Sequence, residues 1–174
     1  MNPKSYQEPY IVKHILVVDD EIDICGNLRV FLEDEGFQVS VAHDGLEGCD
    51  MFQEHSPDLL IVDLHMPKVS GHDLLRKTSS LNPEIPKLVL SGVGVVNEAL
   101  QSIEEGAWDF LSKPLCDYEL LIFKIRQLQD KATMIQQNKR YQEHLEALLE
   151  EKDSEIKDLR YQLDGLKIED DKDE

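Results

Sequence analysis

Acidic side chains stand directly after two apolar runs of the sequence. The run HILVV is followed by Asp19, Asp20 and Glu21, and the run LLIV is followed by Asp63. If both runs are neighbouring parallel strands, their carboxyl ends meet at one edge of the sheet, and the carboxylates gather there. Carboxylates this close repel one another unless a cation lies between them. Oxygen ligands of this kind suit Mg²⁺, which completes its octahedron with waters or a phosphate.

A hydroxyl and an ammonium group follow two later apolar runs. Ser91 closes the run LVLS, and Lys113 stands directly before Pro114 in FLSKP. A metal ion, a lysine and a hydroxyl directed at one carboxylate form the electrostatic clamp that phosphoryl transfer requires, because this transfer depends on positioning and charge neutralisation. We therefore expect Asp63 to act as a nucleophile that becomes an acyl phosphate.

Alternating strands and helices have to position these side chains. The strand candidates are residues 14–19, 37–42, 58–63, 86–91 and 107–112. Between them lie amphipathic segments that predict helices from Ile22 to a stop at Gly36 and around 45–54, 71–80 and 95–105. Repeated βαβ units with right-handed crossovers give an α/β fold, in which a parallel sheet carries helices on both faces.

The character of the chain changes after Pro114. From about Asp117 to Ile168 the sequence is rich in Leu, Gln, Glu and Lys and predicts one long helix. A seven-residue repeat runs through it. Its a positions are Leu121, Leu128, Ile135, Gln142, Leu149, Ile156 and Leu163. Its d positions are Lys124, Lys131, Asn138, Leu145, Lys152, Leu159 and Leu166.

The two halves of this helix favour different packing. In the first half, apolar Ile125 and Ala132 at e positions indicate packing against the globular domain. The second half, from Leu145 to Leu166, reads as a coiled-coil seam with a polar layer at Lys152. A single long surface helix is the alternative. We favour self-association into a dimer, because an isolated helix with one apolar stripe has nothing else to bury it against.

Composition excludes several classes of partner and site. The 174 residues carry 36 acidic and 18 basic side chains, for a formal net charge of −18, which argues against binding to nucleic acid. No apolar run reaches the roughly 20 residues that a bilayer span needs, and no signal peptide is evident, so we expect a cytoplasmic protein without membrane contact. Three scattered cysteines suggest reduced thiols rather than disulfides or a zinc site.

Four motifs in this order and spacing resemble the receiver domain of two-component response regulators, over about residues 12–130. They are VVDDE, LLIVDLHMPKVSG, LVLSG and GAWDFLSKP. The resemblance implies a flavodoxin-like, doubly wound (βα)5 fold with strand order 2-1-3-4-5. It also implies Mg²⁺-dependent phosphorylation of an aspartate by a histidine kinase or a phosphotransfer protein.

The resemblance assigns roles to individual residues. It makes Asp63 the phosphoacceptor, and it makes Asp19, Asp20, Asp63 and the backbone carbonyl of His65 the metal ligands. Ser91 and Lys113 would bind the phosphoryl group, and Phe110 would be the switch aromatic. His65 and Val93 would tune the lifetime of the acyl phosphate. Such a receiver only phosphorylates and dephosphorylates itself, so the chain is not expected to be an enzyme for external substrates.

We divide the chain into an N-terminal extension (1–11), a receiver (12–130), a coiled-coil helix continuous with the last receiver helix (131–168) and an acidic tail (169–174). The phosphorylation signal is expected to pass along the long helix to an effector beyond it. The helix is similar to those that join a receiver to a PP2C-type phosphatase in some response regulators. Other outputs, such as a diguanylate cyclase, would leave similar traces.

Two other functions compete with this interpretation. Phosphatases of the haloacid dehalogenase type also use a strand-end aspartate with Mg²⁺, but they resemble D-x-D-x-T. Here Leu64 and His65 follow Asp63, so the second acid is missing. A structural coiled-coil protein with an inactive receiver is the other alternative, and the intact set of acidic, hydroxyl and lysine residues argues against it.

Overall fold

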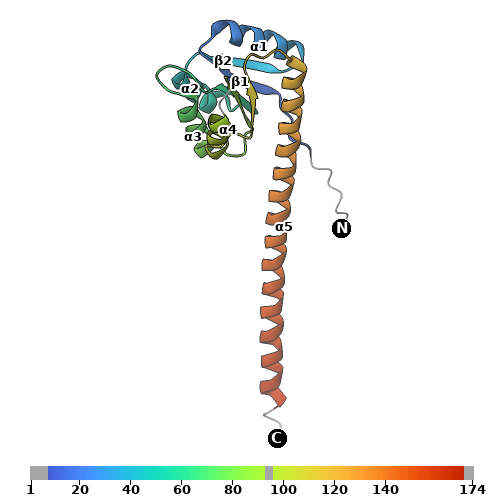
Figure 1. Cartoon of the computed structure of the whole chain (residues 1–174). Coiled ribbons are helices and arrows are strands. Elements are labelled where there is room, and N and C mark those ends of the chain that lie inside the picture. The colour runs from blue at the N-terminus through green and yellow to red at the C-terminus, as the bar shows by residue number, and fades with distance from the viewer. Residues whose placement is uncertain (1–7, 93–95, 171–174) are drawn as a thin grey trace. The chain divides into compact units, whose positions relative to one another are not determined.

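The computed structural model describes residues 8–92 and 96–170, with side chains of the same stretches up to Tyr161 apart from Val96. The chain separates into two compact units, Met1–Met134 and Ile135–Glu174. Strands and helices alternate through the first unit (Figure 1). The elements are β1 (His14–Val18), α1 (Ile22–Asp34), β2 (Gln38–Ala42), α2 (Gly45–His55), β3 (Leu59–Asp63), α3 (Gly71–Leu81), β4 (Lys87–Ser91), α4 (Val96–Glu104), β5 (Asp109–Ser112) and α5 (Tyr118–Asp170).

The strands form one parallel sheet in the order β2-β1-β3-β4-β5. Each connection between strands contains a helix, because parallel neighbours need a crossover rather than a tight turn. The register pairs Val18 with Val62, which brings the ends of β1 and β3 together. The predicted fold class is confirmed, including the strand order and the long C-terminal helix.

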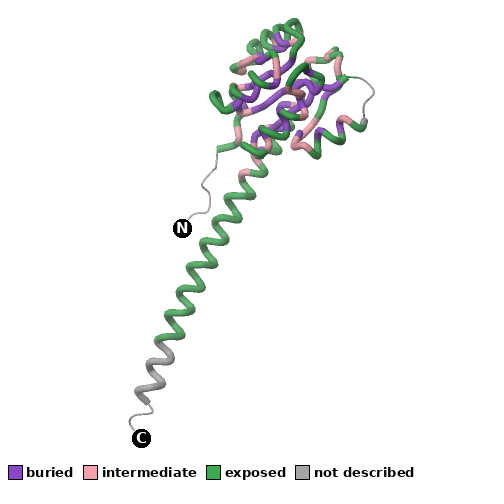
Figure 2. Tube along the Cα trace, turned by 90° about the vertical axis from the view of Figure 1, so that its left-hand side faces the viewer, coloured by how far each residue is buried: buried purple, intermediate pink, exposed green. Residues whose placement is uncertain are grey.

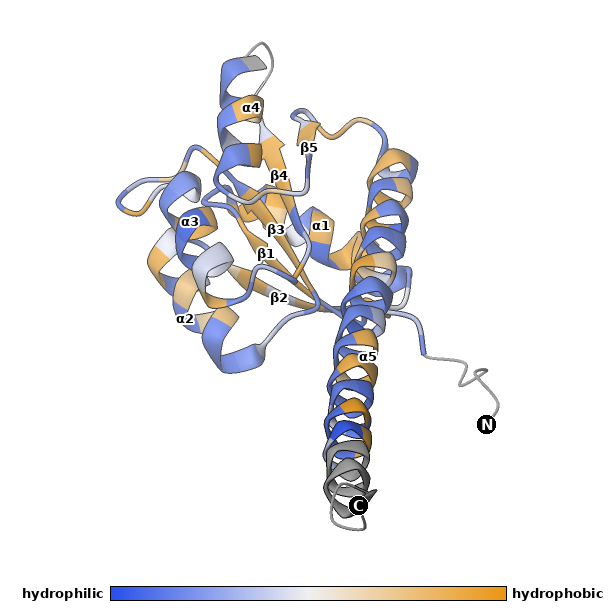
Figure 3. Cartoon of the chain, turned by 90° about the horizontal axis from the view of Figure 1, so that it is seen from below, coloured by the Kyte–Doolittle hydropathy of each residue, from blue (hydrophilic) through white to orange (hydrophobic). Residues whose placement is uncertain are grey.

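Two apolar layers enclose the sheet. On one face, Leu28 of α1 and Leu121 of α5 belong to a core that includes Ile15 and Ile61. On the other face, residues of α2 and α3 such as Phe52 and Leu74 form a second core with the sheet. Figure 3 shows the apolar strands between these helices. All five residues of β3 are buried, so Asp63 ends a strand that is covered on both faces.

Some predicted strand limits are wrong by one or two residues. β1 ends at Val18 rather than at Asp19, and β2, β3 and β4 each begin one residue later than predicted. β4 begins at Lys87 because Pro86 has no N–H to donate to a neighbouring strand. β5 begins two residues late because the Ala107 N–H donates to the Ser102 carbonyl at 2.8 Å, which keeps Ala107 in the turn after α4.

The long helix α5 passes from the first unit into the second. Within the first unit one apolar face of α5 is buried and includes Ile125 and Ala132, as predicted, whereas Leu120 and Phe123 on the same stretch are exposed. From Met134 to Tyr161 no side chain is buried (Figure 2). Among the described residues, no helix combines the length and the apolar composition that crossing a bilayer requires.

Candidate functional site

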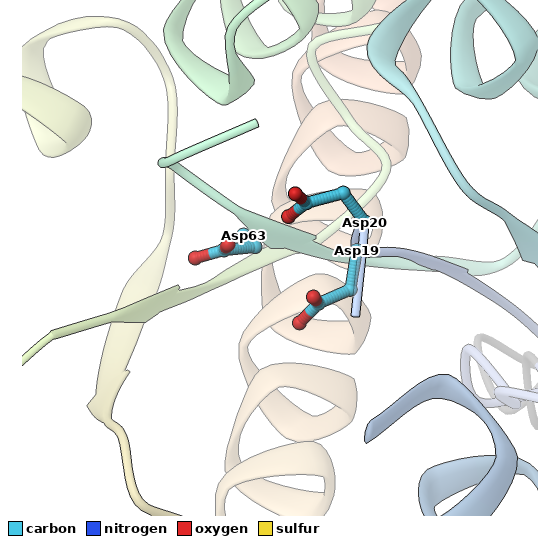
Figure 4. Close-up of side chains that lie close together, drawn as sticks. All are labelled: Asp19, Asp20 and Asp63. Atoms are coloured by element: carbon cyan, nitrogen blue, oxygen red, sulfur yellow. The ribbon is translucent and has the colours of Figure 1, made fainter. Parts of the chain in front are cut away.

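Three carboxylates meet at the carboxyl edge of the sheet. Asp19 and Asp20 follow β1, and Asp63 is the last residue of the neighbouring strand β3 (Figure 4). One oxygen from each carboxylate lies within 4.8 Å of the others. Asp19 and Asp63 are buried, whereas Asp20 is exposed. The predicted acidic cluster therefore exists, with one member open to solvent.

Lys113 is the cation of this cluster. Its Nζ lies 2.7 Å from Oδ2 of Asp19, 3.2 Å from Oε1 of Glu21 and 3.3 Å from Oδ2 of Asp63. The Lys113 N–H donates to the Ser91 carbonyl at 2.7 Å, which anchors the residue directly after β5 to the end of β4. A single ammonium group thus bridges carboxylates that come from the ends of β1 and β3.

Burial and charge oppose each other at this site. Burial raises the pKa of the Asp19 carboxyl, and the hydrogen bond with Lys113 offsets only part of that rise. Burial lowers the pKa of Lys113, but the hydrogen bond with Asp19 and the charge of Asp63 outweigh it, so the net shift is upward. Lys113 therefore stays protonated at neutral pH, and the cluster still favours additional positive charge.

The segment after Asp63 is held close to the strand end. The Gly71 N–H donates to the Leu64 carbonyl at 3.1 Å, and Ser70 caps α3 by accepting from the Asp73 N–H at 3.2 Å. A Cβ added to Gly71 would collide with the Asp63 carbonyl oxygen and lie 2.7 Å from the Leu64 Cα. Only glycine fits where the backbone at the start of α3 comes this close to the backbone of Asp63 and Leu64. The start of α3 therefore holds the backbone around Asp63 in place.

Comparisons with known proteins identify the family. Residues 15–126 match the family described as the response regulator receiver domain. The chain belongs to this family. Response regulator MprA of Mycobacterium avium is 39% identical over 107 residues, which cover 62% of this chain and 47% of that relative. MprA of Mycobacterium tuberculosis strain H37Rv is 38% identical over 107 residues, covering 62% of this chain and 46% of its own.

Solved structures agree with this assignment. NtrX from Brucella abortus superposes with a TM-score of 0.71 at 28% identity, covering 75% of this chain and 30% of its own. A CheY-like receiver domain protein from Methanospirillum hungatei gives a TM-score of 0.66 at 29% identity, covering 70% of this chain and 97% of its own. The chain spans about half the length of the curated relatives that it matches.

The acidic cluster of this receiver is typical of the family's Mg²⁺ site. Three carboxylates within 4.8 Å supply the hard oxygen ligands that Mg²⁺ prefers. Asp20 is exposed, so a bound ion can keep several waters or accept a phosphate oxygen. The donor set therefore fits the predicted metal.

The remaining predicted site residues occupy different positions around the receiver site. Ser91 is buried at the end of β4, and its hydroxyl lies 3.5 Å from the Gly92 carbonyl oxygen. Phe110, the predicted switch aromatic, is 45% exposed. Phe110 lies in β5, the edge strand, where alternate side chains face solvent. Val93 falls outside the described residues.

His65 reaches from the receiver site to α4. Its side chain is exposed, and its Nε2 lies 3.3 Å from Oε1 of Glu98. This contact joins the residue two positions beyond Asp63 to the first turns of α4. The sequence did not predict the pairing, because no local pattern relates a loop histidine to a glutamate on a later helix.

Sequence reasoning also missed the polar contacts of two glutamates, Glu21 and Glu105. Glu21 lies 3.2 Å from the Lys113 ammonium through its Oε1, a contact that its place in the acidic run after β1 does not reveal. Glu105, just after α4, is paired with His72 and with Arg76 of α3, the latter at 2.7 Å. Burial raises the pKa of Glu105, but its hydrogen bonds, first of all with His72, outweigh this and lower it. These contacts tie the end of α4 to α3.

Proposed function

We propose that Asp63 is the phosphoacceptor of a two-component phosphorelay. One observation carries this proposal: Asp63 ends a fully covered strand yet lies 3.3 Å from the Lys113 ammonium and within the same cluster as Asp19 and Asp20. A buried carboxylate is costly unless cations compensate it. The same compensation would stabilise a phosphoryl group that Asp63 acquires.

The reaction transfers a phosphoryl group from a phosphohistidine of a histidine kinase or phosphotransfer protein. An oxygen of Asp63 attacks the phosphorus, the bond to the imidazole nitrogen breaks, and the departing imidazole takes up a proton. Lys113 neutralises charge on the phosphoryl oxygens, and Ser91 offers a hydroxyl donor at the end of β4. Mg²⁺, when held by Asp19, Asp20, Asp63 and the His65 carbonyl, supplies further charge neutralisation.

We propose the remaining predicted roles on the same basis. His65 and Val93 tune how long the acyl phosphate lasts, and Phe110 changes its exposure when Ser91 moves toward the phosphoryl group. The exposed ring of Phe110 and the contact between His65 and Glu98 support a response in β5 and α4. Phosphorylation adds about −1.5 to −2 charges at Asp63, which is enough to bias such a rearrangement.

The output is proposed to pass through α5. We keep the boundaries 12–130 for the receiver, 131–168 for a dimeric coiled coil, and 1–11 and 169–174 for the flanking segments. The exposed apolar residues of α5 beyond Met134 support the coiled coil. An effector domain or partner beyond the helix completes the pathway. The protein acts as a switch rather than as an enzyme for external substrates, and a PP2C-type output stays a prediction.

Ligand-induced stabilisation tests the phosphoacceptor. Beryllium fluoride with Mg²⁺ mimics a phosphoryl group on a carboxylate, so it should raise the unfolding temperature of the whole chain. A ligand at about 100 times its Kd adds about 2.7 kcal/mol. Asp63→Ala should abolish this gain, whereas Asp50→Ala, an exposed residue of α2, should retain it. An equal gain in Asp63→Ala would refute the assignment.

A further inference from the structure

The second unit of the chain presents an apolar stripe that follows the seven-residue repeat. Between Met134 and Tyr161 the exposed stripe includes Ile135 and Ile156 at a positions and Leu145 and Leu159 at d positions. Leu149, also at an a position, is 66% exposed. Ile at a with Leu at d is the combination that favours two-stranded parallel coiled coils.

We propose that the occupant of this stripe is a second copy of the chain, aligned parallel and in register. The inference rests on the dimer named in the proposed function and adds its orientation. Two features of the repeat support it: the residues that each alignment would bring together in a layer of the seam, and the charges that it would bring together beside the seam.

Layer matching favours the parallel pair. In register, Leu145, Leu149, Ile156 and Leu159 each meet their own copy, and the amide of Gln142 meets another amide. An antiparallel pair centred between Glu150 and Glu151 would instead set Gln142 against Leu159 and Lys152 against Leu149. Burying a polar group against a leucine leaves it without a hydrogen-bond partner, which is costly.

Sliding the antiparallel pair does not remove the mismatch. A shift by one heptad in either direction sets Ile156 against Asn138 or against Lys152. The parallel arrangement does bring two Lys152 side chains to one layer. The Lys152 Nζ, however, lies 2.7 Å from Oε2 of Glu155 in the same chain, so each ammonium has a carboxylate at the rim of the seam.

The flanking charges favour the same orientation. In a parallel pair, g positions face e positions of the partner five residues later, which sets Glu155 opposite Arg160. No such pair between Met134 and Tyr161 joins like charges. In the antiparallel pair centred between Glu150 and Glu151, e positions face e positions, so Glu146 meets Asp153. Like charges placed opposite each other disfavour that pairing.

The parallel alignment has a functional consequence. Both copies of α5 leave their first units at the same end of the seam, because each chain enters the seam after Met134. A rotation or change of pairing at that end would therefore reach both helices together, and any segment after residue 170 would start from a common end.

Disulfide cross-linking of the full chain tests the orientation. Cys25 and Cys49 are buried and Cys116 is exposed, so Cys116→Ser provides the background. Leu159→Cys places a thiol in the seam away from its middle, so that the two thiols meet in the parallel pair but lie far apart in the antiparallel one. Ser154→Cys, at the outward f position, is the matched control. Sedimentation equilibrium before oxidation reports the assembly, and non-reducing electrophoresis after oxidation with copper phenanthroline reports the cross-link.

We predict a dimer in both variants and rapid cross-linking of Leu159→Cys alone. Thiols that face each other in a dimer have an effective concentration in about the millimolar range, so the reaction should be at least about a hundredfold faster than collisions between micromolar chains. A dimer without this cross-link would contradict the parallel orientation but not dimerisation. A monomer would contradict dimerisation as well, and a larger assembly would contradict two-stranded pairing.

Discussion

The Lys113 ammonium lies 2.7 Å from the Asp19 carboxylate and so joins the end of β5 to the end of β1 across the edge of the sheet. Asp19 is completely buried, and the Lys113 side chain is only 14% exposed. Removing one partner of such a pair leaves an uncompensated charge, which costs far more than the pair itself contributes.

Lys113→Met is expected to lower the free energy of unfolding by about 3 kcal/mol in the absence of Mg²⁺, because Asp19 and Asp63 lose their common cation. Saturating Mg²⁺ should restore much of this loss, since the ion then compensates the same carboxylates. Urea denaturation with and without Mg²⁺ measures both values. Lys124→Met removes a separate ion pair with Asp109 and should respond equally in the two conditions. An equal loss for Lys113→Met in both conditions would contradict the metal site.

Asp20→Asn should weaken Mg²⁺ binding by about tenfold or more, equivalent to about 1.4 kcal/mol. The substitution removes one anionic oxygen ligand from the cluster while leaving the buried Asp19 and Lys113 in place. Isothermal titration calorimetry gives the two dissociation constants. Asp50→Asn controls for net charge alone, and a similar weakening in that variant would mean that Asp20 acts only through the overall charge of the protein.

Gly71→Ala should destabilise the protein by about 1–3 kcal/mol, because the added methyl group must displace backbone around Asp63. Gly26→Ala is the matched control within α1, where no atom lies within 4 Å of the added Cβ. That variant should be more stable than the parent by about 0.5–1 kcal/mol. Thermal unfolding compares the two variants. Equal effects of the same sign would mean that the packing at Gly71 is looser than the structure indicates.

Lys87 gives the fold a pH dependence that is independent of the candidate site. This lysine is fully buried at the start of β4, and burial lowers its pKa from 10.5 to about 8. Between these values the unfolded chain binds more protons than the folded one, so folding gains stability as pH rises from 8 toward 10.5.

Lys87→Met should remove that gain. The difference in unfolding free energy between parent and variant should shift in favour of the parent by about 2 kcal/mol from pH 8 to pH 10. Urea denaturation across this range measures the difference, with Lys68→Met, at an exposed lysine, as the control. A pH-independent difference for Lys87→Met would show that the buried ammonium does not titrate in this window.

The strands and the carboxylate cluster were predictable because both depend on local pattern and on a general rule of parallel sheets. Unbroken apolar runs such as LLIV identify buried strands, and residues at their carboxyl ends gather at one edge. Asp19, Asp63 and Lys113 therefore came together as predicted. The strand limits were less predictable, because they depend on individual hydrogen bonds such as the one from Ala107 to Ser102.

The contacts that sequence reasoning missed all depend on tertiary packing. Lys87 stands in the motif PKLVLS and has no local feature that indicates burial, yet its ammonium donates to the Asn82 and Ile85 carbonyls at 2.9 Å. The exposure of Phe110 follows from the edge position of β5, which its own sequence does not reveal. The pairing of His65 with Glu98 requires knowing where α4 lies.

The most direct test of the central claim is to locate a phosphoryl group on Asp63. The full chain is incubated with acetyl phosphate and Mg²⁺, intact mass is measured, and borohydride reduction followed by peptide mass spectrometry identifies the modified residue. We predict a gain of one phosphoryl group per chain and reduction of residue 63 to homoserine, with neither seen in Asp63→Asn. Modification at another carboxylate, or an unmodified parent under conditions that label a known receiver, would contradict the account.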